Sequence, residues 1–88
     1  MASYMTKTYE LSCQYDARKS FYGKAKVKIK EDLKMLFSYD IEVCKIQNNQ
    51  PKIMIDNITQ TTLRHIKEFL KQNGFFADTK KQIISDYK

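Results

Sequence analysis

The sequence predicts an α+β fold, in which an antiparallel β-meander of three to four strands is covered on one face by a C-terminal helix and followed by a short terminal helix. Two observations predict this class. Residues 24–30 alternate lysine with apolar residues, which is the period of a strand with one buried face. Within residues 61–73 the apolar residues recur instead at helical spacing.

Four segments have strand character, and they occupy residues 7–15, 21–29, 33–46 and 53–55. Gly23 predicts a bulge or a close approach of the backbone within the second segment. The alternation of apolar residues changes parity near Val43 and Cys44, so we expect a bulge or bend in the third segment. Polar connections at 16–20, 30–32 and 48–51 separate the segments.

Pairing the apolar sides of the second and third segments places Ile29 opposite Leu33 and Lys28 opposite Lys34. The same rule, applied to the first segment, places Glu10 opposite Lys26. A slip of two residues, which would place Asp40 opposite Lys24, stays open.

Two helices follow the strands. Thr59 is the predicted N-cap of the first helix, with Asn57 as an alternative, and Gly74 fits the left-handed residue after its end. Residues 79–82 have the pattern of a capping box, which predicts a second, short helix over residues 80–87.

The 88 residues are expected to form one domain, 1–88, with residues 1–5 disordered or derived from a tag. The net charge is +6, and residues 17–34 alone contribute +5, with seven basic and two acidic side chains. No apolar run has the length of a membrane span and no signal peptide is recognisable, so we expect no membrane partner.

The concentration of lysine on one side of a strand predicts an anionic partner, and nucleic acid is the leading hypothesis. The scarcity of arginine favours contact with the phosphate backbone over reading of bases. The candidate nucleic-acid-binding residues are Arg18, Lys19, Tyr22, Lys24, Lys26, Lys28, Lys30 and Lys34.

Two alternatives remain open. The first is a protein-binding regulator that uses a strand edge or an apolar tail formed by Phe75, Phe76, Ile83, Ile84 and Tyr87. The second is a helix-turn-helix over residues 60–87, in which Lys80 and Lys81 would contact phosphate.

The residues for catalysis are largely missing, so we expect a non-enzymatic protein without cofactor or metal. His65 is the single histidine, and its position beside Ile66 on the predicted helix favours a structural role. Cys13 and Cys44 are expected to be buried free thiols. Asp40 and Glu42 alternate onto one face, but two carboxylates are too few to hold a metal ion.

The segments YDARKSFYGKA (residues 15–25) and TTLRHIKEFLKQNGF (residues 61–75) resemble small uncharacterised proteins carried by phages and other mobile elements of low-GC Gram-positive bacteria. The resemblance covers most of the chain from Thr6 onward. It implies a small accessory protein made in a bacterial cytoplasm, and proteins of this kind include inhibitors of host or defence enzymes. It assigns no role to an individual residue.

Overall fold

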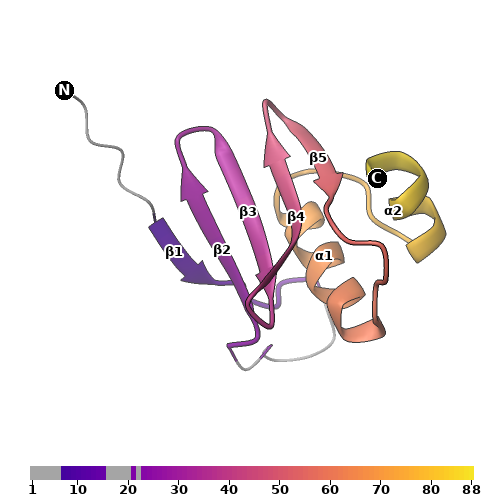
Figure 1. Ribbon diagram of the computed structural model, residues 1–88, viewed down its shortest axis with the longest axis horizontal. Coiled ribbons are helices and arrows are strands. Elements are labelled where there is room, and N and C mark those ends of the chain that lie inside the picture. The colour runs from indigo at the N-terminus through magenta and orange to yellow at the C-terminus, as the bar shows by residue number, and fades with distance from the viewer. Residues whose placement is uncertain (1–6, 16–20, 22) are drawn as a thin grey trace.

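The computed structural model describes residues 7–15, 21 and 23–88, which form a five-stranded antiparallel sheet and two helices (Figure 1). The α+β class is therefore confirmed. The expectations for residues 1–5 and for the connection at 16–20 lie outside the described residues. The elements are β1 (Lys7–Glu10), β2 (Ala25–Lys30), β3 (Leu33–Ser38), β4 (Ile41–Gln47), β5 (Gln50–Ile53), α1 (Gln60–Gln72) and α2 (Lys80–Tyr87).

The described strands form a meander in the order β1-β2-β3-β4-β5, which is one or two strands more than the sequence predicted. The prediction was wrong because it read residues 33–46 as one strand. The chain turns back after β3 at Tyr39 and Asp40, whose φ angles are 53° and 67°. Tight hairpins with positive φ at both positions usually carry Asn-Gly or Asp-Gly, so Tyr-Asp gave no recognisable turn signal.

The predicted connection at 48–51 is confirmed as a turn at its first two residues, while Gln50 and Pro51 belong to β5. Asn48 and Asn49 have φ angles of 53° and 62°, a conformation that asparagine adopts more readily than most residues. β5 begins at this turn and ends at Ile53, so the predicted strand over residues 53–55 starts earlier than expected.

The first two strands are shorter than the predicted segments 7–15 and 21–29. Lys24 donates a backbone hydrogen bond to the carbonyl of Phe21, and Gly23 has a φ of +73°, so the chain turns before β2 begins at Ala25. A Cβ on Gly23 would lie 2.7 Å from Oε1 of Glu10, which confirms a close approach at this glycine.

The pairing of β2 with β3 differs by one residue from the predicted register. Ile29 lies opposite Lys34 rather than Leu33, and Lys28 lies opposite Met35 rather than Lys34. A shift of one residue moves every β3 side chain to the other face of the sheet. The predicted pair of Glu10 and Lys26 is confirmed.

The expected irregularity near Val43 and Cys44 is also confirmed. Leu36 pairs with Cys44 but Phe37 pairs with Glu42, so Val43 is an extra residue in β4. The bulge allows both Val43 and Cys44 to be buried although they are adjacent in sequence.

Both helices begin and end as the local sequence predicts. The Thr59 side chain accepts from the backbone N–H of Thr62, and Thr79 does the same for Gln82. At the C-terminus of α1, Gly74 has a φ of +83° and Phe75 donates a backbone hydrogen bond of 2.9 Å to Leu70. This is the Schellman arrangement that the sequence indicated.

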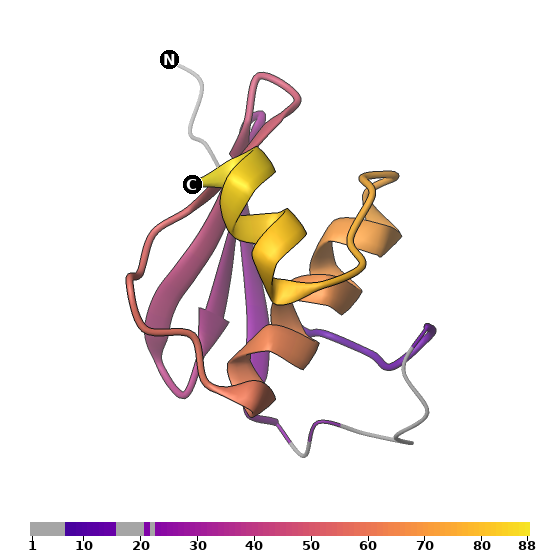
Figure 2. The ribbon, with the colours of Figure 1, turned by 90° about the vertical axis from the view of Figure 1, so that its right-hand side faces the viewer.

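The core lies between one face of the sheet and the helices. Val27, Leu36, Cys44 and Ile53 form one row across the sheet, and all four are buried. Figure 2 shows α1 and α2 on the same side of the sheet, and among the described residues no element covers the other side. No described helix has the length and apolar character needed to cross a bilayer.

Candidate nucleic-acid interface

The side of the sheet that faces away from the helices is called the outer face here. Residues paired across neighbouring strands point to the same side, so the register of the strands defines this face. Its basic members are Lys26, Lys28 and Lys30 of β2, Lys45 of β4 and Lys52 of β5. Its other members are Thr8, Glu10, Leu33, Met35, Phe37, Glu42, Gln47 and Gln50.

The β2 lysines of the outer face are exposed and uncovered. Neighbouring lysines on one side of a strand are about 7 Å apart along its axis, so the three ammonium groups form a continuous positive row. Among the described residues, no carboxylate forms an ion pair with any of them; the ion pair that the described chain contains joins Lys88 to Asp56. The row therefore keeps its charge available for an anion.

A second positive cluster lies across the sheet from this row. Lys45 and Lys52 are directly opposite each other on β4 and β5, and Met35 separates them from Lys28. Like charges directly opposite each other destabilise an antiparallel pair, and a bound anion would remove that cost. Among the paired strand residues that the structure describes, the outer face thus has five lysines and two carboxylates.

Apolar side chains lie among these lysines, because the register places Leu33, Met35 and Phe37 on the outer face. Each of the three is half-buried although no helix covers it. The ammonium of Lys28 lies 4.8 Å from the centroid of the Phe37 ring, within the range of a cation–π contact. The outer face is therefore a mixed basic and apolar surface rather than a uniformly solvated one.

Lys34 does not belong to this surface, which corrects the prediction that it extends the lysine row. It points to the helix side, where its ammonium donates a hydrogen bond of 2.6 Å to Oδ1 of Asn73 at the end of α1. Of the other predicted binding residues, Arg18, Lys19 and Tyr22 lie outside the described residues.

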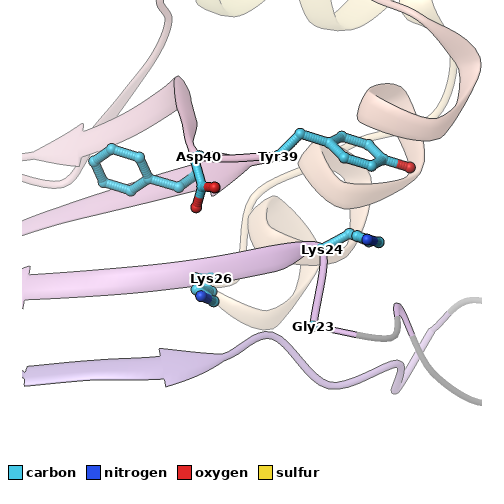
Figure 3. Close-up of a pocket in the computed structure, with 6 residues that line it drawn as sticks. Gly23, Lys24, Lys26, Tyr39 and Asp40 are labelled. Carbon is cyan, nitrogen blue, oxygen red and sulfur yellow. The ribbon is translucent and has the colours of Figure 1, made fainter.

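A shallow pocket of about 260 Å³ lies at one end of the lysine row, beside the turn between β3 and β4 (Figure 3). Its lining includes Gly23, Lys24 and Lys26 from the β2 side. Lys24 lies just before β2, and its ammonium is 5.8 Å from the centroid of the Tyr39 ring. The remaining lining residues are Phe37, Tyr39 and Asp40.

The apolar tail of the protein-binding alternative is mostly part of the core, which corrects the expectation of an exposed sticky surface. Ile83 is fully buried, and Phe75, Ile84 and Tyr87 pack against the core. Phe76 is the exception, with 66 % of its surface exposed. The Tyr87 hydroxyl donates to the carbonyl of Phe76 at 2.7 Å, which fixes α2 against this segment.

His65 and Cys44, two side chains with catalytic potential, are both buried. His65 is buried on α1, where its Nδ1 lies 2.8 Å from Oγ of Ser38 and its ring meets Phe21 edge-on. Burial raises the pKa of the Cys44 thiol to about 12, so it is not a thiolate nucleophile near neutral pH. Neither Cys44 nor Cys13 is in a disulfide.

The two acids that the sequence places on one face, Asp40 and Glu42, lie in different elements. Asp40 lies in the turn and Glu42 in β4, so the two are not on one strand as the sequence suggested. Within residues 7–15, 21 and 23–88, no group of three or more His, Cys, Asp or Glu side chains could hold a metal ion.

Glu68 is the important residue that sequence reasoning missed. It is buried on α1, and its carboxylate accepts backbone hydrogen bonds of 3.0 Å from Gln14 and 2.9 Å from Tyr15. It also accepts from the amide of Gln72 one turn later. The signal was a carboxylate two residues after Ile66 and beside Phe69, on the apolar side of α1.

Comparison with protein-family models matches residues 9–86 to the model described as Family of unknown function (DUF8033). The match covers well over half of the chain and includes the second half of β1, the other four strands, α1 and nearly the whole of α2. A search of the curated proteins and a search of the solved structures each found no match.

Proposed function

The chain belongs to the Family of unknown function (DUF8033), and we propose that it binds the phosphate backbone of nucleic acids through its outer face. The observation that carries the proposal is the row of Lys26, Lys28 and Lys30, which is uncovered and has no ion-pair partner among the described residues. Lysine ammonium groups of this kind neutralise phosphates and release the counterions condensed around them.

The composition of the face supports contact with the backbone rather than sequence reading. Arginine is the side chain most often used to read guanine, and the described part of the outer face has none. Of the two arginines in the chain, Arg64 is on α1 and Arg18 lies outside the described residues. The interleaved apolar residues favour a macromolecular partner over a free inorganic anion.

The role is proposed to be non-enzymatic. The buried His65 and the protonated thiol of Cys44 support this view, since neither is presented to a substrate. The resemblance to phage and mobile-element proteins supports an accessory function in a bacterial cytoplasm. The alternative of a protein-binding regulator would use a strand edge or the exposed Phe76, because the other residues of the apolar tail are buried in the core or pack against it.

The test measures affinity for labelled single-stranded and duplex oligonucleotides over a range of salt concentrations. Three to five phosphate contacts predict a slope of log K against log salt of about −3 to −4.5 on duplex DNA. If none of these nucleic acids binds at low salt, the proposal is wrong.

Matched variants locate the contact. The double variant Lys26→Gln with Lys28→Gln should bind more weakly and reduce the slope by about 1 for each lysine removed. The control is Lys80→Gln with Lys81→Gln, which removes the same charge from exposed positions on α2. If the control weakens binding and the β2 variant does not, the contact is at α2, as the helix-turn-helix hypothesis requires.

A further inference from the structure

The pocket beside the turn between β3 and β4 has a composition that a simple phosphate site would not need. Lys24 and Lys26 supply positive charge, but Asp40 places a carboxylate in the same lining. Figure 3 shows the Asp40 carboxylate extending from the turn toward the side of the pocket that carries Lys26. Because a carboxylate repels phosphate and accepts hydrogen bonds, the part of a ligand next to Asp40 should carry no negative charge and should offer a hydrogen-bond donor.

Tyr39 is presented to solvent by an unusual backbone. The residue is 52 % exposed, its ring lies 6.0 Å from the His65 ring between centroids, and its φ of 53° lies in the left-handed region that bulky residues rarely adopt. Asp40, with a φ of 67°, is held in the same region. These are the angles of a tight two-residue hairpin turn, and this turn places both residues in the lining of the pocket.

We infer that this pocket takes one unpaired base of a single-stranded nucleic acid, which stacks on the Tyr39 ring. The inference rests on the proposed function and adds the form of nucleic acid and the place where it is recognised. Lys24 and Lys26 contact the phosphates on either side of the stacked base. Asp40 accepts a hydrogen bond from an exocyclic amino group, as acidic side chains do from cytosine.

The dimensions suit this ligand. Pockets that enclose drug-sized molecules have volumes of roughly 300–1,000 Å³, so a shallow pocket of about 260 Å³ admits a single planar base better than a larger cofactor. Stacking on an exposed aromatic side chain requires a base whose face is free. A base inside a duplex is paired and stacked on its neighbours, so duplex DNA would contact the lysine row without entering the pocket.

The absence of tryptophan from the chain gives a direct test. In a Tyr39→Trp variant the indole is the single tryptophan, and stacking of a base on it quenches its fluorescence. We expect quenching on addition of single-stranded oligo(dC) and little change with a duplex of the same length. The control is Tyr15→Trp, at a tyrosine that is 59 % exposed and does not line the pocket, and its fluorescence should not respond.

A second variant removes the ring without disturbing the turn. Tyr39→Gly suits the positive φ, so the hairpin should be retained. It should bind single strands about tenfold more weakly, while its affinity for duplex stays as in the parent protein. The ratio of single-strand to duplex affinity is therefore the quantity to measure.

The outcomes separate this inference from the proposed function. If the parent protein binds nucleic acid but the ratio is the same in Tyr39→Gly, the base pocket is wrong and the lysine face stands. Quenching by duplex as strong as that by single strands would also overturn the pocket. If no nucleic acid binds at low salt, both proposals fall together.

Discussion

The ammonium nitrogen of Lys34 donates a hydrogen bond of 2.6 Å to Oδ1 of Asn73, the residue that caps the C-terminus of α1. This contact joins β3 to the end of α1 on the helix side of the sheet, while the lysines of β2 point to the outer face. The hairpin of β2 and β3 therefore separates its lysines into one with a structural partner and three that are available to a ligand.

This separation predicts different results for two lysines that are close in sequence. Lys34→Gln should lower the free energy of unfolding by about 0.5–1.5 kcal/mol through the lost hydrogen bond, and should leave affinity for nucleic acid unchanged. Lys28→Gln should weaken binding to nucleic acid and have little effect on the free energy of unfolding. Urea denaturation and oligonucleotide binding measured on both variants check the prediction, and a loss of binding in Lys34→Gln would contradict it.

Replacement of Glu68 should loosen a segment that is distant from it in sequence. Glu68→Ala removes the acceptor for the backbone N–H groups of Gln14 and Tyr15, so it should destabilise the protein by about 2–4 kcal/mol. Amide hydrogen exchange should become faster at Gln14 and Tyr15 before it changes in the centre of the sheet. Equal acceleration throughout the chain would mean that Glu68 does not anchor this segment specifically.

Two residues with positive φ predict substitutions that change the stability of the protein in opposite directions. Gly74→Ala should cost about 1 kcal/mol, because its φ of +83° disfavours a Cβ while no atom within 4 Å would clash with it. Glu31→Gly should stabilise the protein by about 0.5–1 kcal/mol, since Glu31 has a φ of 56° in an exposed turn. Thermal or urea unfolding of both variants tests the prediction, and a shift of the same sign in both would contradict it.

The raised pKa of Cys44 predicts a loss of stability in alkali. The folded state holds the thiol proton up to about pH 12, whereas the unfolded chain releases it near pH 9. Stability should therefore be fully present below pH 9 and fall above it by up to about 1.4 kcal/mol per pH unit. Urea denaturation at pH 8–11 should show a shallower decline in Cys44→Ala, and identical slopes would contradict the burial of this thiol.

The helical half of the fold could be predicted from the sequence because its signals are local. Thr59, Gly74 and Thr79 mark helix ends through interactions with residues a few positions away. The strand of residues 24–30 was equally clear, since its alternation admits one orientation relative to the core.

The register of β3 could not be predicted, because both of its faces carry apolar residues. The sequence favours the side of Met35 and Phe37 for the core, but the structure buries Leu36 and Ser38. The polar members of the inner side are satisfied by α1, since Ser38 meets His65 and Lys34 meets Asn73. These partners are far away in sequence, so a count of apolar positions cannot detect them.

The candidate site was predicted in part. The shared face of Lys26, Lys28 and Lys30 followed from the period of one strand. The addition of Lys45 and Lys52 required the register of β3 and the missed turn at residues 39–40, because both determine which side of β4 and β5 is outward.

Lysine reactivity tests the central claim most directly. Light acetylation of the protein, with and without a saturating oligonucleotide, can be read at each lysine by mass spectrometry. The lysine-row proposal predicts that Lys26, Lys28 and Lys30 are protected by the oligonucleotide, whereas Lys80 and Lys81 on α2 react at an unchanged rate. Unchanged reactivity at the three β2 lysines, or protection confined to α2, would contradict it.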